Sequence, residues 1–425
     1  MKLKKIIKTI AEKTHIMFFW NVYKIYKLNG SKKAYKIIKN KVFNLFISNK
    51  KLKSNFLRKI ESIIDNIEKD QKVIISLSFI DWDIPLFQRP QHLALQLANK
   101  GIIYFYCTLQ NSNLKYFIEK QAENLYVLDE FDIILEKVKN KDKYLHVLST
   151  NYFKQDTERI EKAISLGYKI IYEYIDEISE DITGEKIENF VFERHKKLLK
   201  DESNCIVIAT ADKLYQEVLK YRQKNCKLIT NGVNVNHFRD NHYLVPKSIR
   251  KITSQNKTII GYYGALAKWI DYKLMSEIAA KRNDWNIVLL GVIYDQEIYK
   301  SDIIRAKNVY ILPPVHYNTI PTYGKCFDVC IIPFKINDIT KSTSPIKLFE
   351  YMALGKPIVT TPMPECKKYK SVYIADNRAD DFIEKINLAL KNNSKRYQKL
   401  LEKEALENDW SSKADEIINL ISRKL

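Results

Sequence analysis

The residues that could do the most chemistry lie between 327 and 361, where a buried strand, a polar loop and a helix follow one another. Ser344 is a good helix N-cap and the proline after it fits a first helical turn, so a helix should begin there. Lys347 then falls in the first turn, where the helix dipole favours an acid. A cation at this place makes sense if a stronger anion, such as a diphosphate, sits on the helix N-terminus.

Glu350 lies one turn beyond Lys347, on the same side of the expected helix. Its carboxylate could accept hydrogen bonds from two neighbouring hydroxyls of a ribose. The alternative is an exposed helix that carries an ordinary Lys/Glu pair. Spacing alone leaves both interpretations open.

The elements that must position these residues alternate between buried strands and helices from residue 72 onward. Continuous apolar runs separated by helical segments indicate parallel strands joined by βαβ crossovers. The sequence therefore predicts an α/β protein with two doubly wound, Rossmann-like domains, over residues 71–235 and 236–407. The runs expected as strands are 73–79, 102–108, 144–148, 169–174, 205–209, 227–230, 258–263, 285–291, 309–312, 328–333 and 357–361.

The composition is that of a globular protein: of 425 residues, 46% are apolar and 28% are charged. No apolar run approaches the roughly 20 residues that span a bilayer, so we expect neither an integral membrane protein nor a signal peptide. The six cysteines form no CxxC pair, which disfavours a disulfide framework or a structural zinc site and indicates a reducing cytoplasm.

The run SPIKLFEYMALGKPIV (344–359) resembles the donor-binding signature of retaining glycosyltransferases with the two-domain GT-B fold. It is especially similar to the branch of teichuronic-acid and other cell-surface polysaccharide transferases. The resemblance implies that a sugar passes from a nucleotide-diphosphate-sugar donor to a glycan or lipid-linked acceptor, with retention. It also implies two domains facing a cleft, and a closing helix at 408–425 that packs back on the first one. Further similar segments follow in the family's order at 88–101, 209–220, 231–238, 259–272 and 407–418.

The glutamate that matches Glu350 holds the nucleotide ribose in that family. Family members often carry a second glutamate eight positions upstream, which contacts the donor sugar, but this chain has Ser342 there. The branch with Asn-x-x-Thr before the helix, matching Asn337 and Thr340, often lacks that glutamate, so sugar recognition must come from elsewhere. This departure keeps open a catalytically inactive GT-B-like protein that binds glycan or acts as a scaffold. A nucleotide-sugar epimerase on the same fold is the other alternative.

Four more residues of the second domain are candidates for donor binding. Gly264 ends a buried strand, so its backbone could approach the diphosphate, and Lys268 could reach the same phosphates or be an ordinary solvated lysine. Asn337 and Thr340 could bond the leaving phosphate or the sugar, or cap their loop. No metal-ligand spacing is present, so we expect no metal cofactor. The helix N-terminus and the lysines would stabilise the departing diphosphate instead.

In the first domain, Arg89 begins a helix and could bind a phosphate of the acceptor or donor, or serve as a structural clamp. Asp176 and Glu177 follow the strand 169–174 at the carboxyl edge of the sheet. A carboxylate there could orient the acceptor hydroxyl or remove its proton, with helix capping as the alternative for Asp176. His146 lies inside a strand and is interpreted as a core histidine.

Residues 1–70 lie outside the resemblance and are expected to form a basic, helical extension, with 18 Lys/Arg against 5 Asp/Glu, or +13 of the chain's net +21. Residues 32–47 could form a helix with an apolar stripe flanked by lysines. With the aromatic residues at 17–20 this suits an interfacial helix on an anionic membrane. The expected location is therefore cytoplasmic, peripheral on the inner face of the cell membrane. Packing on the catalytic domains or binding to RNA are the alternatives, but no RNA-binding motif is present, so no nucleic-acid partner is expected.

Overall fold

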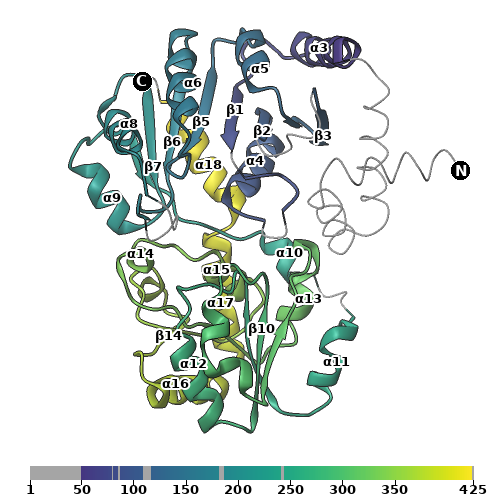
Figure 1. The fold of residues 1–425 in the computed structure, drawn as a ribbon, viewed down its shortest axis with the longest axis vertical. Coiled ribbons are helices and arrows are strands. Elements are labelled where there is room, and N and C mark those ends of the chain that lie inside the picture. The colour runs from purple at the N-terminus through teal and green to yellow at the C-terminus, as the bar shows by residue number, and fades with distance from the viewer. Residues whose placement is uncertain are drawn as a thin grey trace, which may run out of the picture.

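A computed structural model describes residues 49–78, 80–84, 87–108, 116–180, 186–240 and 244–423. Two α/β domains lie one above the other, each built on its own sheet with helices on both faces (Figure 1). This confirms the predicted two-domain α/β class. The segments predicted as an interfacial helix, 17–20 and 32–47, lie outside the described residues.

The first domain has an eight-stranded sheet in the order β3-β4-β2-β1-β5-β6-β7-β8. All neighbouring strands are parallel except the antiparallel pair β3 and β4. Most of these strands are buried on both faces, as expected for a sheet covered by helices on either side. The strands are β1 (Val73–Ser78), β2 (Ile103–Thr108), β3 (Ile118–Ala122), β4 (Leu125–Leu128), β5 (Lys143–Leu148), β6 (Lys169–Tyr174), β7 (Cys205–Ala209) and β8 (Cys226–Leu228).

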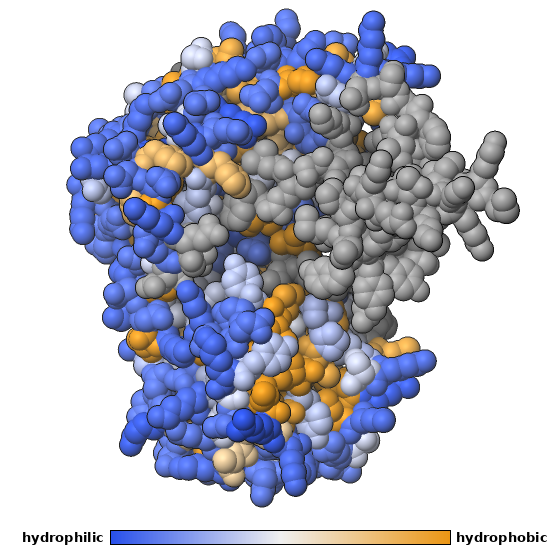
Figure 2. All heavy atoms as spheres, viewed as in Figure 1, coloured by the Kyte–Doolittle hydropathy of each residue, from blue (hydrophilic) through white to orange (hydrophobic). Residues whose placement is uncertain are grey.

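The second domain has a six-stranded, wholly parallel sheet in the order β11-β10-β9-β12-β13-β14. Figure 2 shows hydrophobic residues gathered on the face of this domain that is turned to the viewer, amid a mostly hydrophilic surface. The strands are β9 (Thr258–Tyr263), β10 (Trp285–Leu290), β11 (Val309–Leu312), β12 (Val329–Ile332), β13 (Ile358–Thr360) and β14 (Val372–Ile374).

The helices connect and cover these strands. Those of the first domain are α3 (Asn49–Asp65), α4 (Arg89–Asn99), α5 (Phe131–Lys137), α6 (Lys154–Ser165), α8 (Asn189–Lys200) and α9 (Asp212–Leu219). Those of the second are α10 (Val235–Arg239), α11 (Lys247–Thr253), α12 (Tyr272–Lys281), α13 (Ile320–Gly324), α14 (Asp338–Lys341), α15 (Ile346–Ala353), α16 (Ala379–Lys391) and α17 (Lys395–Glu407), and α18 (Trp410–Ile421) follows them. In the described part of the chain, no helix is both long enough and apolar enough to cross a membrane.

The first domain begins earlier than the predicted boundary at residue 71. Helix α3 lies inside the segment predicted as an extension, yet its Phe56 and Ile60 are fully buried in the core of the first domain. Its apolar positions therefore pack on the first domain, and its exposed positions are polar or charged. Residues 49–65 therefore pack on a catalytic domain, which was the alternative to membrane binding for the N-terminal segment.

The chain crosses between the domains twice. The first crossing leads from β8 to α10, and the second leads from α17 to α18, which packs on α4 of the first domain. Trp410 begins α18 and is fully buried there. The two crossings touch, because Val233 and Asp409 form a parallel β-bridge.

Candidate donor-binding site

The helix that was expected to bind the donor, α15, begins at Ile346, later than predicted. Pro345, in an extended conformation, is the N-cap, so the prediction of Ser344 as the cap was wrong. The Ser344 hydroxyl is buried and has no hydrogen-bond partner among the described residues. A buried hydroxyl without a partner costs about 1–3 kcal/mol, so this atom marks a place where a ligand could bind.

Lys347 lies directly over Gly264, which follows β9. A β-carbon on Gly264 would lie 2.0 Å from the Lys347 Cε and 2.6 Å from its Nζ. Gly264 also has φ +139°, a conformation that favours glycine. The missing side chain at position 264 therefore makes room for the lysine, which ends beside the carboxyl ends of β9 and β10.

The ammonium of Lys347 is poorly compensated. Burial lowers its pKa, and the charge of Glu350 only partly opposes this. Its Nζ makes no hydrogen bond or ion pair with the described residues, and it lies 5.5 Å from the centre of the Tyr262 ring. Even a partly buried cation is stabilised by a charged or hydrogen-bonding partner. At a helix N-terminus, that partner would be an anion.

Glu350 is buried, with only 5% of its surface exposed. Burial raises its pKa to about 7, against the opposing effects of Lys347 and the Tyr263 hydroxyl. The alternative of an ordinary, exposed Lys/Glu pair is therefore wrong. The carboxylate lies one turn from Lys347, where it could accept hydrogen bonds from ligand hydroxyls.

The other predicted donor residues have different environments. Lys268 is partly buried, and its backbone N–H donates to Asp295 Oδ2 at 2.7 Å. Asn337 is the N-cap of α14 and accepts a hydrogen bond from the Thr340 N–H at 3.0 Å, while the Asn337 N–H donates to Thr340 Oγ1 at 3.0 Å. Asn337 and Thr340 thus form the loop cap that was their alternative.

A direct bond joins the two domains beside this loop. Ser342 Oγ donates to Glu177 Oε2 at 2.7 Å, and Lys213 Nζ lies 2.7 Å from the same oxygen. Nearby, the Asp212 N–H donates to Glu365 Oε1 at 2.8 Å. Glu177 of the first domain thus places a carboxylate beside Ser342, the position where the resemblance showed that one was missing.

Asp176, next to Glu177, is partly buried and makes no side-chain hydrogen bond with the described residues. Burial raises its pKa to about 7. It lies near the Tyr152 hydroxyl, whose pKa is raised to about 12, mainly by burial and then by this carboxylate. A carboxylate with a pKa near neutrality at the edge of a parallel sheet is suited to exchange a proton with a ligand hydroxyl.

Arg89 is in an enclosed ion pair, with 3% of its surface exposed. Its Nε and Nη2 donate to Glu173 Oε1 at 3.1 and 2.7 Å, and its Nη1 donates to the Thr230 carbonyl at 2.9 Å. His146 Nε2 lies 3.1 Å from the other Glu173 oxygen. Burial alone would raise the pKa of Glu173, but Arg89 and His146 lower it to about 2. Arg89 thus occupies the structural-clamp position, and His146 is a core histidine.

Two residues of this region, Glu173 and Asn231, were not singled out from the sequence. An acid in the middle of a buried strand was the available signal for Glu173, because such a charge requires a partner. No local signal marked Asn231. Among the described residues, no three His, Cys, Asp or Glu side chains group as metal ligands would.

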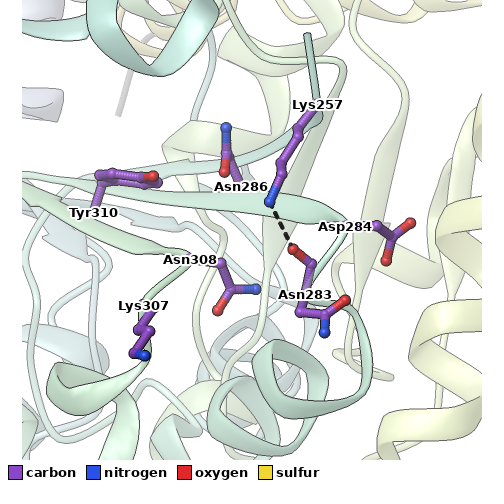
Figure 3. A pocket seen from close by; sticks show the side chains of 7 residues that line it. All are labelled: Lys257, Asn283, Asp284, Asn286, Lys307, Asn308 and Tyr310. Carbon is purple, nitrogen blue, oxygen red and sulfur yellow. Dashed lines mark hydrogen bonds between the residues drawn. The ribbon is translucent and has the colours of Figure 1, made fainter. Parts of the chain in front are cut away.

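A surface pocket of about 470 Å³ lies elsewhere on the second domain (Figure 3). Lys257, Asn286 and Asn308 line it, at or just before the amino ends of β9, β10 and β11. Gly264 and Gly291 mark the opposite, carboxyl ends of these strands. The pocket is therefore distinct from the site around Lys347.

Residues 257–392 match the family model described as "Glycosyl transferases group 1". TuaH of Bacillus subtilis (strain 168), which carries the name of a teichuronic acid biosynthesis glycosyltransferase, is 25% identical over 258 residues. That match covers 57% of this chain and 64% of TuaH, so it spans just under two thirds of the relative's length.

Solved structures share the fold across most of the described chain. The sucrose-phosphate synthase of Thermosynechococcus elongatus superposes with a TM-score of 0.62 at 12% identity, covering 82% of this chain and 98% of that one. Anabaena HepE, solved with UDP and glucose, superposes with a TM-score of 0.59 at 13% identity, covering 83% and 100%. At these identities the likeness establishes a GT-B fold.

Proposed function

Because residues 257–392 form a group 1 glycosyltransferase domain within a GT-B fold, we propose that this protein transfers a sugar from a nucleotide-diphosphate-sugar donor to a glycan or lipid-linked acceptor. One observation carries the proposal: the Lys347 ammonium lies partly buried and without a hydrogen-bond partner in the described chain, at the N-terminus of α15. A diphosphate supplies the anion that this place requires.

The donor would be held by three groups around the first turn of α15. Lys347 and the helix N-terminus face the negative charge that builds up on the departing diphosphate, and the Ser344 hydroxyl can donate to a phosphate oxygen. One turn on, Glu350 can accept hydrogen bonds from the two ribose hydroxyls. Such fixed charges stabilise the leaving group without a metal, so we expect activity to persist in a chelator.

The acceptor side would use the carboxyl edge of the first sheet. Asp176 can orient the acceptor hydroxyl, and either its carboxylate or the leaving phosphate can take the proton. We expect the configuration at the transferred sugar to be retained, with attack from the face that the leaving group vacates. The UDP and glucose bound to the structural neighbour HepE support a UDP-sugar as the first donor to test.

We place this reaction in the assembly of a cell-surface polysaccharide, at the inner face of the cell membrane. The likeness to TuaH, named for teichuronic acid biosynthesis, supports the pathway class. The +13 charge of residues 1–70 supports attraction to anionic lipid. Liposomes of phosphatidylglycerol and phosphatidylcholine should therefore float the full chain more strongly than a chain truncated before Asn49, and equal flotation would refute the membrane contact.

Calorimetry with UDP and hydrolysis of UDP-glucose test the donor site. Lys347→Met should weaken UDP binding by tenfold or more, as loss of a charge-assisted contact implies. Lys273→Met is the matched control, because Lys273 is exposed on α12. Glu350→Ala should lose donor hydrolysis. Wild-type UDP binding in the Lys347 variant would remove the site, and an epimer product formed without acceptor would indicate an epimerase.

A further inference from the structure

Asn231 lies where the chain first crosses between the domains, and its amide bonds to both of them. Its Nδ2 donates to the Ser344 carbonyl at 2.6 Å, and its Oδ1 accepts from Arg89 Nη1 at 3.3 Å. A guanidinium can only donate hydrogen bonds. Arg89 therefore determines which end of the amide faces it, and the NH₂ group must turn to Ser344.

Arg89 is itself held by several contacts. Two of its nitrogens are held by Glu173, a residue with no exposed surface, and a third is held by the Thr230 carbonyl. The guanidinium carbon also lies 5.8 Å from the centre of the Trp410 ring. The orientation of Asn231 is thus fixed from the core of the first domain.

The backbone on the other side of Asn231 is equally constrained. A β-carbon on Gly232 would lie 2.5 Å from the Asn408 carbonyl. The Val233 N–H donates to that same carbonyl at 3.0 Å, and the Trp410 N–H donates back to the Val233 carbonyl at 2.9 Å. The first crossing is therefore hydrogen-bonded to the second, which restrains the backbone next to Asn231.

From these contacts we infer that Asn231 is a positioning residue for the donor: by holding the Ser344 carbonyl, it sets the first turn of α15 relative to the first domain. Both unpartnered groups of the site, the Ser344 hydroxyl and the Lys347 ammonium, lie within three residues of that carbonyl. A shift of the Ser344 carbonyl would therefore displace both the Ser344 hydroxyl and the Lys347 ammonium. That the ligand is a nucleotide-sugar donor rests on the proposed function, whereas the contacts of Asn231 do not depend on it.

Asn231→Asp separates positioning from folding. An aspartate keeps the acceptor for Arg89 and adds an opposite charge, but it cannot donate to Ser344. The stronger pair with Arg89 and the repulsion between the carboxylate and the Ser344 carbonyl oppose each other, so we expect a melting temperature close to that of the wild type. We also expect the Kd for UDP and the KM for UDP-glucose hydrolysis to rise about tenfold, the contribution of one hydrogen bond, with kcat within about twofold. Asn236→Asp is the matched control, since Asn236 is exposed on α10.

Asn231→Ala removes both bonds, so it should show the same rise in Kd together with a lower melting temperature. Hydrogen exchange in the nucleotide-free protein provides a readout without a ligand: residues 343–349 should exchange faster in Asn231→Asp than in Asn236→Asp. Unchanged exchange and unchanged UDP affinity would overturn the inference. A wild type that fails to bind UDP would instead overturn the proposed function, and the exchange data would still decide the role of Asn231.

Discussion

Lys347 lies in the space that a side chain on Gly264 would fill, although the two residues are on different elements of the second domain. The distance from a β-carbon at position 264 to the Lys347 Cε would be only 2.0 Å. The glycine that follows β9 and the lysine in the first turn of α15 thus fit together. Their mutual fit, more than the backbone approach alone, explains why a glycine stands at 264.

Gly264→Ala should weaken UDP binding strongly and destabilise the fold by about 1–3 kcal/mol, because the new methyl group displaces Lys347 and the φ of +139° is strained for alanine. Calorimetry and urea unfolding measure the two effects. In a Lys347→Ala background the clash is absent, so the same change should cost less stability. An equal cost in both backgrounds would contradict the proposed contact.

Glu350 should make the free energy of unfolding depend on pH. Its folded pKa of about 7 lies above the ordinary 4.5, so the folded state binds the proton more tightly, and stability falls as pH rises from about 4.5 to 7. The glutamine of Glu350→Gln does not titrate. From pH 5 to pH 8, the free energy of unfolding of this variant should therefore rise by about 1–3 kcal/mol relative to that of the wild type. Urea midpoints at both pH values test this, with exposed Glu277→Gln as the control.

Asp176→Asn should separate transfer from donor binding. The amide cannot take a proton, so transfer should fall by about 10²–10⁴-fold if Asp176 acts as the base, while the Kd for UDP stays within about twofold. In the wild type, transfer should rise as pH increases through about 7, where this carboxyl ionises. A pH profile of the two proteins checks this. Undiminished transfer by the variant would assign proton removal to the leaving phosphate.

Arg89→Met should destabilise the protein by about 3–5 kcal/mol, because it leaves the charge of Glu173 buried with only His146 beside it. Urea unfolding measures this loss. Adding Glu173→Gln removes the unpaired charge and should recover part of the lost stability. If the double variant were no more stable than Arg89→Met, the ion pair would not be what holds Arg89.

Ser342→Ala should loosen the contact between the domains, because it removes the hydrogen bond to Glu177. The free-energy difference between the closed arrangement and more open ones should shift by about 0.5–1.5 kcal/mol towards the open ones. Small-angle scattering of the nucleotide-free protein should then give a larger radius of gyration than the wild type. Thr343→Ala serves as the control, because the Thr343 hydroxyl donates to the Ile339 carbonyl of α14, within the same domain, at 2.9 Å.

Most of the fold could be predicted from the sequence because buried parallel strands leave a continuous apolar run. Residues 169–174, 205–209, 258–263 and 309–312 match β6, β7, β9 and β11 residue for residue. Three strands, β3, β4 and β14, were missed. Strands β3 and β14 are half-exposed, so neither has the burial of a central strand. In addition, β3 carries polar residues (IEKQA), and β14 has only three residues, too few to form a pattern. The antiparallel β3–β4 pair also departs from the βαβ alternation.

The candidate site was only partly predictable, for a different reason. Spacing along one helix predicted that Lys347 and Glu350 lie together. It could not predict their burial, which distinguishes a binding site from an exposed ion pair. The bonds from Asn231 to Ser344 and from Ser342 to Glu177 join residues 113 and 165 positions apart. Because such pairs arise from how the two domains meet, no local pattern in the chain announces them.

The bridge between Val233 and Asp409 pins the two interdomain strands of chain to each other at one point. Because the two interdomain crossings are joined at this bridge, the domains can rotate about it but cannot separate there. Any opening that admits a substrate must therefore swing about this point, with the largest travel at the far rim and almost none beside Asn231. With the chain cut just before Asn408, the first crossing would be the remaining covalent link between the two domains, and the bridge would persist through the packing of α18 on α4.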